Sequence, residues 1–196
     1  MAYEELKSSG ITAKTPENIM LGAGTIHRGL TFADGKWNFE ESLIGATSGG
    51  SKVSIVPEFT QIEVDGALVK VKGLNPKTGE TATMEVNFVE MTPDILKMAT
   101  AGKVAASTEY EGYTEITSKA RIEEGDYVEN LGYIGKKIDG TPIIIIFDYA
   151  LCTSGFTTEG KNKEAGVFAG TFECVADVTP EADTLPWHIL YPTPTV

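Results

Sequence analysis

The segment GATSGGSK at residues 45–52 has the glycine spacing of a phosphate-binding loop. In such a loop, backbone N–H groups and a lysine would hold the phosphates of a nucleotide. Gly45 and Gly50 fit this spacing, but Ser51-Lys52 reverses the Lys-Ser/Thr order that the motif requires. The segment also leads into an apolar run typical of a strand, whereas a phosphate loop leads into the amino end of a helix. We therefore interpret it as a surface loop.

The rest of the sequence does not indicate a metal site or acid–base chemistry. The two histidines, His27 and His188, are too few for a His-rich metal site, and neither has a cysteine ligand nearby in the sequence. No GxSxG nucleophile motif occurs. The acidic turn at residues 123–126 lacks the spaced oxygen ligands of an EF-hand loop. The sequence therefore predicts no catalytic residue, no metal and no cofactor, and we expect that the protein is not an enzyme.

Composition limits the class of protein. The 196 residues suffice for a single domain with a sizeable core. The formal net charge of −12 gives no general attraction for nucleic acid, because phosphate binding needs clusters of Lys and Arg. No apolar run reaches about 18 residues, so we expect no membrane insertion. Cys152 and Cys174 lie in apolar runs without a CxxC motif, which indicates free thiols in a protein made in a cytoplasm.

Most of the chain has the pattern of β-strands, with β-branched and aromatic runs bounded by Gly, Pro, Asn or Asp. In residues 81–88, polar and apolar side chains alternate, as in a half-buried antiparallel strand. Residues 143–147 are apolar on both faces, so that strand is either central in a sandwich or covered by a neighbouring subunit. Asp65-Gly66 predicts a tight hairpin turn. The expected strands are Lys52–Val64, Leu68–Lys72, Thr81–Met91, Thr114–Ile122, Tyr127–Ile134, Pro142–Leu151 and Ala165–Val178.

One helix is well indicated. Thr92 can cap it, Pro93 suits its first position, and Asp94 lies at its positive end. Gly102 can terminate it. Its short length predicts a helix packed on the flank of a sheet, and residues Tyr3–Lys7 form a second, weaker helical segment.

Residues 22–51 are rich in glycine and have no clear periodicity, which predicts a long loop or arm. Loops of this length are uncommon in compact domains and tend to be functional or to become ordered on a partner. Trp37 and Phe39 in its middle are costly to leave in water.

Residues 44–74 combine a small-residue loop, an extended run, Asp65-Gly66 and a second run that contains VKGL. This order resembles the major tail protein of long-tailed bacteriophages, the subunit of the tail tube. The resemblance continues through residues 78–99 and, more weakly, through residues 163–194. It implies a mainly β fold over residues 1–196, an antiparallel β-sandwich or half-barrel with one flanking α-helix.

The same resemblance implies a structural virion protein that assembles as hexameric rings stacked into a tube. DNA would pass through the tube into the host without specific binding. The implied partners are further copies of the chain, the tail initiator or baseplate, the tape-measure protein and the terminator. The implied location is the virion tail, after synthesis in the cytoplasm of the bacterial host.

Two sets of residues are candidates for this function. From strand alternation, we expect a lumen-facing set of Thr83, Glu85, Asn87, Thr171 and Glu173. From the glycine-rich segment, we expect an inter-ring loop with Gly35, Trp37, Phe39, Gly45, Gly49 and Gly50. On this hypothesis, deletion of residues 35–49 leaves a folded subunit that no longer polymerises.

The alternative function is a non-enzymatic β-sandwich module that recognises a carbohydrate or a peptide. Aromatic side chains can stack on sugar rings, although core packing and interface contacts are commoner roles for them. The candidates are Trp37, Tyr110, Tyr113, Trp187 and Tyr191.

Overall fold

The computed structural model describes residues 9–160, 162–178 and 183–193, so the possible helix Tyr3–Lys7 lies outside the described residues. The chain is mainly β with short helices, as the sequence predicts. The helices are α1 (Thr15–Asn18), α2 (Phe39–Ser42), α3 (Pro93–Thr100) and the 3-10 turn η1 (Glu124–Asp126). The strands are β1 (Met20–His27), β2 (Phe32–Ala33), β3 (Lys36–Trp37), β4 (Thr47–Phe59), β5 (Lys77–Phe88), β6 (Lys103–Ala106), β7 (Thr114–Thr117), β8 (Val128–Lys137), β9 (Pro142–Cys152), β10 (Thr158–Glu159), β11 (Val167–Cys174) and β12 (Trp187–Leu190).

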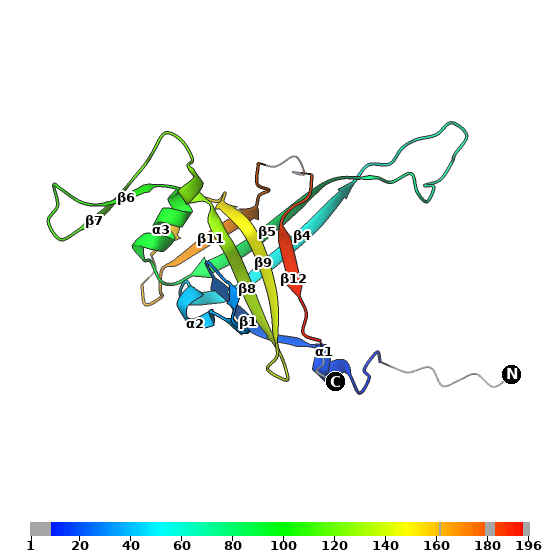
Figure 1. The fold of residues 1–196 in the computed structure, drawn as a ribbon, viewed down its shortest axis with the longest axis horizontal. Helices are drawn as coiled ribbons and strands as arrows, with labels where there is room; N and C mark the ends of the chain where they lie inside the picture. The colour runs from blue at the N-terminus through cyan, green and yellow to red at the C-terminus, as the bar shows by residue number, and fades with distance from the viewer. Residues whose placement is uncertain (1–8, 161, 179–182, 194–196) are drawn as a thin grey trace.

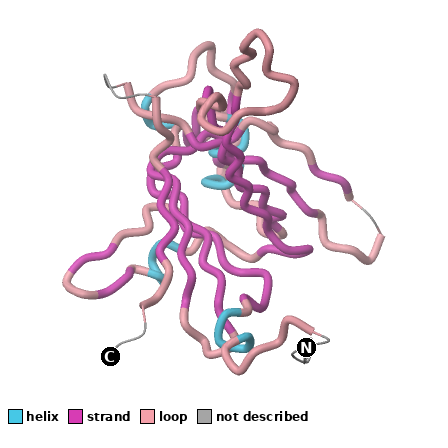
Figure 2. The backbone as a smooth tube through the Cα atoms, turned by 90° about the vertical axis from the view of Figure 1, so that its right-hand side faces the viewer, coloured by secondary structure: helices cyan, strands magenta, loops and turns pink. Residues whose placement is uncertain are grey.

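The main sheet is antiparallel, with strand order β1-β8-β9-β11-β5-β4. β12 pairs with the first half of β9, and β11 pairs with its second half. As a result, β4, β5 and β11 cross β8, β9 and β12 in two layers (Figure 1 and Figure 2). The far edges approach each other at one end, where Ile44 N donates to Ile26 O at 3.1 Å and Arg28 N donates to Ser42 O at 2.8 Å. The fold is therefore a sandwich that is half closed into a barrel.

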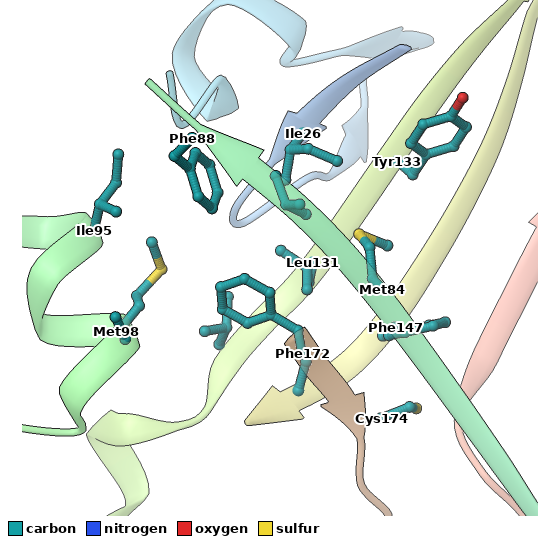
Figure 3. Packing of buried hydrophobic residues seen from close by; sticks show 14 of the residues in the cluster. Ile26, Met84, Phe88, Ile95, Met98, Leu131, Tyr133, Phe147, Phe172 and Cys174 are labelled. Atoms are coloured by element: carbon teal, nitrogen blue, oxygen red, sulfur yellow. The ribbon is translucent and has the colours of Figure 1, made fainter. Parts of the chain in front are cut away.

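The main core lies between these layers and under α3 (Figure 3). β5 contributes every second side chain to it, so the alternation expected for this strand is confirmed. Phe88 stacks on Phe168 with ring centroids 6.0 Å apart and meets Phe172 edge-on at 6.4 Å. Stacked and edge-on ring pairs of this kind add to the stabilisation that burial provides. α3 adds Ile95, Met98 and Ala99.

β9 is buried on both faces, as its apolar run predicts. Ile145 and Phe147 belong to the main core. Ile144 and Ile146 face the other way and form a second cluster with Leu30 and Ile134, against which Trp37 and Phe39 pack. The cover on this second face therefore comes from the same chain, and not from a neighbouring subunit.

The expected long loop at residues 22–51 is instead a series of short elements. It contains most of β1, the β2–β3 hairpin, α2 and the start of β4. The hairpin turns at Asp34 and Gly35, which have φ angles of 51° and 74°. In β1, a Cβ on Gly24 would lie 2.4 Å from the Tyr133 ring, so glycine is needed there for close packing. Two-residue strands and a glycine-interrupted strand give no periodicity for a sequence pattern to detect.

The Asp65-Gly66 turn is confirmed, but its flanking strands are not. Ala67 N donates to Val64 O at 3.1 Å, and Gly66 has a φ of 88°. However, β4 ends at Phe59 and β5 begins at Lys77, so residues 68–72 are not a strand. These residues have a strand-like composition but lie outside the sheet.

The helix α3 begins as predicted. The Thr92 side chain accepts a hydrogen bond from Ile95 N at 3.2 Å. The left-handed residue that ends the helix is Ala101, with φ 47°, and not Gly102. Gly102 serves close packing instead, because a Cβ there would lie 2.9 Å from Thr117 O.

Truncation of the core should cost much of the stability. We expect Phe172→Ala to lower the free energy of unfolding by about 3–5 kcal/mol, because it leaves a cavity between the layers. Thr171→Ala, one residue away on the opposite face, should change it by less than about 0.5 kcal/mol. Urea unfolding followed by tryptophan fluorescence measures both. Equal losses in the two variants would contradict the assigned faces.

The packing of Trp37 and Phe39 reverses the expectation for the deletion of residues 35–49. Because these rings cover the second cluster, we now expect the deletion variant to be misfolded and not merely unable to polymerise. Near-UV circular dichroism and protease resistance of the purified variant test this. A compact, protease-resistant variant would restore the original hypothesis.

Candidate functional site

The five residues expected to face a lumen all lie on the face of β5 and β11 that points away from the main core. Their neighbours along each strand are buried, while they are exposed or partly exposed. The structure brings them together, because Thr171 is paired with Glu85 and Glu173 with Thr83. β4 extends this surface, since Lys52 is paired with Glu85 on its other side. The outward sides of β4, β5 and β11 thus form one continuous surface, which we call the polar face.

Side-chain hydrogen bonds on the polar face are few. Lys52 Nζ donates to Glu85 Oε1 at 2.7 Å, and Asn87 Nδ2 donates to Gly50 O at 3.2 Å. A shallow groove of about 290 Å³ runs between these groups and Thr171. The groove has small residues along its floor, so it offers a smooth polar surface with no cluster of cations.

The residues expected to form one inter-ring loop lie in separate places. Trp37 stacks on Phe39 with centroids 6.1 Å apart, and both cover the second cluster. Gly35 is at the β2–β3 turn, and Gly45 lies beside Glu90, whose Oε1 accepts from Ala46 N at 3.1 Å. Gly49 and Gly50, with φ angles of 82° and 85°, lie in an irregularity of β4 beside the polar face. The structure does not join the six residues into an arm.

The segment that does project from the domain is residues 60–76, which we call the arm (Figure 1). It continues the β4–β5 hairpin beyond the sheet, where Thr60 N donates to Pro76 O at 3.2 Å and Ile62 N to Leu74 O at 2.8 Å. Beyond these bonds its two limbs separate around an open space of about 530 Å³. Leu68 is 98% exposed and Val69 is 75% exposed. Other exposed apolar side chains on and beside the arm are Val56, Phe59, Ile62, Val64 and Val71.

Sequence patterns missed the arm because its apolar residues resemble those of buried strands. Two signals could have identified it. Asn75-Pro76 and Gly73 interrupt the second limb, which argues against a regular strand there. Pro57 cannot donate to a ladder and therefore marks β4 as an edge strand. Among the described strands, β4 pairs only with β5 and β12 pairs only with β9, so each leaves one long side unpaired.

A second projection, the β6–β7 hairpin, lies at the end of the molecule opposite the arm (Figure 1). Its strands pair from Lys103–Thr117 to Ala106–Thr114 and are separate from the main sheet. The tip is ordered by two turns, in which Tyr110 N donates to Ser107 Oγ at 3.0 Å and Tyr113 N donates to Tyr110 O at 3.2 Å. Tyr110 and Tyr113 are exposed.

Asp126 anchors the base of this hairpin. It is 5% exposed, and its Oδ2 accepts from Lys119 Nζ at 2.5 Å and from Glu123 N at 2.8 Å. Lys97 of α3 donates to Gly125 O at 3.2 Å, which ties the same turn to the helix. Burial alone would raise the pKa of Asp126, but the Glu123 N–H and the Lys119 ammonium outweigh it and lower that pKa.

Cys174 and His27 are buried within the fold. Burial, with Asp148 and Glu80 nearby, raises the pKa of Cys174 to about 12, so its thiol is unreactive at neutral pH. His27 is buried, with Nδ1 2.9 Å from Ser42 Oγ and Nε2 2.9 Å from Thr25 Oγ1. Because the Ser42 hydroxyl donates to Asn38 O, it accepts from Nδ1, and burial lowers the pKa of this neutral histidine.

The aromatic residues considered for ligand stacking do not converge on one site. Trp187 Nε1 donates to Glu80 Oε2 at 3.0 Å, which fastens β12 against β5. Tyr191 donates to Asn18 Oδ1 at 2.8 Å. Trp37 is part of the second cluster, and only Tyr110 and Tyr113 lie close in the chain on one projecting tip.

Comparison with protein-family models gives no match, and a search of curated proteins also gives none. Within the described residues, no group of three or more His, Cys, Asp or Glu could hold a metal ion. None of the described helices is long and apolar enough to cross a membrane.

The hairpin anchor should make stability depend on pH in the acid range. The pKa of Asp126 is lower in the folded state than the usual value of about 3.9. Its carboxylate therefore stabilises the fold above about pH 4, and this contribution is lost as pH falls below that. We expect Asp126→Asn to lower the free energy of unfolding by about 1.5–3 kcal/mol at pH 7 and by a smaller amount at pH 3.

Urea unfolding at the two pH values measures this difference. The exposed neighbour Glu124 supplies the control, since Glu124→Gln should have little effect at either pH. A loss for Asp126→Asn that is the same at pH 3 and pH 7 would contradict the role of the charged carboxylate.

Proposed function

We propose that this protein is the subunit of a phage tail tube, a structural virion protein that forms stacked hexameric rings. The observation that carries the proposal is the exposed apolar arm at residues 60–76. Soluble monomers seldom expose contiguous apolar surface of this kind unless it contacts a partner. A second copy of the chain is the partner that a tube supplies at every subunit.

Unpaired strand edges support the ring. β4 and β12 each leave one side without a backbone partner among the described residues. Exposed edges invite pairing with another chain unless they are covered. Head-to-tail pairing of different edges around a closed ring satisfies them and limits growth in the plane of the ring.

The polar face supports a conduit for DNA. Its carboxylates, Glu85 and Glu173, come from two neighbouring strands. The neighbouring cation Lys52 is already paired with Glu85. With a net charge of −12, such a lining would not bind phosphate groups, so DNA could pass without being held.

In this role the subunit would meet further copies of itself, the initiator or baseplate, the tape-measure protein and the terminator. It would be made in the cytoplasm of a bacterial host and end in the virion tail. No catalytic step, metal or cofactor is required, because the work is done by assembly and by the lining of the conduit.

One observation favours the alternative, a module that binds a carbohydrate or a peptide. Tyr110 and Tyr113 are exposed together on an ordered tip beside carboxylates. Such a module would form a small discrete species with a saturable ligand, and it would leave the apolar arm unexplained. The tube explains the arm, so we favour it.

Negative-stain electron microscopy of the concentrated protein tests the proposal. Hollow tubes of uniform width with a ring repeat would support it. A small closed dimer with both β4 and β12 edges covered would overturn it. Glycan-array binding by a monomer that forms no tubes would favour the alternative instead.

The arm should be needed for assembly but not for folding. We expect Leu68→Asp to abolish tubes while changing the free energy of unfolding by less than about 0.5 kcal/mol, because the side chain is 98% exposed. Replacing residues 60–76 by Asn-Gly between Phe59 and Lys77 should have the same effect, since the two strands end as a pair.

Val178→Asp is the matched control, because this apolar side chain is 100% exposed but lies outside the arm. It should assemble as wild type does. Sedimentation and microscopy report assembly, and thermal unfolding reports stability. Normal tubes from Leu68→Asp would mean that the arm is not an assembly contact.

A further inference from the structure

We infer that the second limb of the arm, Leu68–Lys72, docks on the acidic tip of the β6–β7 hairpin of another copy. This inference rests on the proposed function, because it names the surface that receives the arm between copies. The occupant is therefore a second copy of this chain, bound head to tail.

The two surfaces carry opposite charges. The second limb carries Lys70 and Lys72, whereas the hairpin carries Glu109, Glu111 and Glu115. All five side chains are exposed, and within the described residues none of them takes part in an ion pair. Opposite charges of this kind steer two surfaces together and fix their orientation.

Both surfaces also expose large apolar side chains. The lysines of the limb alternate with Val69 and Val71, and Leu68 precedes them. The hairpin tip likewise places Tyr110 and Tyr113 among its carboxylates. Tyrosine provides a large, stiff contact area with a polar end, which suits the centre of an interface. Lysine stems can also lie along aromatic rings and so exclude water.

The arm and the hairpin project from opposite ends of the longest axis of the molecule (Figure 1). One chain therefore cannot bring its own two surfaces together. Two different surfaces at opposite ends make a heterologous contact, which extends along one direction when the rotation between successive copies does not close a ring. This is the contact that the stacking of rings needs.

The hairpin tip is organised before any partner arrives. Its two turns hold residues 107–113, and Lys119, Asp126 and Lys97 fix its base to η1 and α3. A preformed receptor loses less conformational entropy on binding. Each subunit of a ring would make one such contact with the next ring. Because these contacts form together, individually weak contacts would give a stable stack of rings.

Charge reversal and restoration test the inference. We expect Lys70→Glu with Lys72→Glu, or Glu109→Lys with Glu111→Lys, to raise the concentration needed for assembly about tenfold or more. The quadruple variant, with both pairs reversed, should return toward wild type because the charges are again complementary. Light scattering against protein concentration measures this, and added salt should weaken wild-type assembly.

Matched controls reverse equal numbers of exposed charges elsewhere. Lys14→Glu with Lys36→Glu, and Glu40→Lys with Glu41→Lys, should leave assembly within about threefold of wild type, because these charges lie outside both surfaces. A quadruple variant no better than the double variants would overturn the inference, as would double variants that behave like the controls. In the second case wild-type tubes would still stand, so the proposed function would survive.

Cysteine cross-linking locates the contact directly and does not depend on tubes. In a Cys152→Ser background, one population carries Lys72→Cys and another carries Glu111→Cys, and the two are mixed and oxidised. We expect a disulfide-linked product of one chain of each kind, and far less product when Glu40→Cys replaces Glu111→Cys. Absence of the first product, or a dominant arm-to-arm product, would overturn the inference whether or not tubes form.

Discussion

The alternation of side chains along β5 is the constraint on which the rest of the structure depends. Ala82, Met84, Val86 and Phe88 are all buried, and β4 and β11 are both in register with this one strand. A slip by one residue would send every one of these side chains into water and every polar neighbour into the core. The same strand fixes the polar face on its other side. The residues that lead into the strand, before Lys77, form the second limb of the arm. Core, polar face and arm are therefore set by one register.

The sequence predicted the parts of the fold in which a local pattern is long enough. The alternation in β5, the doubly apolar run in β9 and the cap of α3 were each sufficient to place their elements. β1 was missed because Gly22 and Gly24 interrupt its apolar residues, and β12 because its 4 residues are too few to show a pattern. The five residues of the polar face follow from alternation alone, so they were placed correctly relative to the core. Whether they line a conduit depends on other copies of the chain.

The arm shows why apolar residues in a sequence do not reveal what covers them. The sequence predicts that Trp37 and Phe39 contact a neighbouring ring, but they pack on the second cluster of their own chain. Leu68 and Val69 were expected inside a strand pair, but they are exposed. In each case the residue type indicated that exposure of the side chain to water is unfavourable. Only the path of the chain in space shows whether an apolar side chain is buried within its own subunit or remains exposed on the surface.

Pro57 has a further effect on what can bind beside the arm. It lies in an edge strand and contributes no N–H on the unpaired side. A foreign strand could extend a backbone ladder along β4 as far as this residue but would lose a donor there. Proline thus acts as a barrier to unregulated sheet growth toward the arm. Recognition beyond Pro57 would depend on the shape and charge of side chains, which differ between proteins. It would not depend on the peptide backbone, which is the same in all of them.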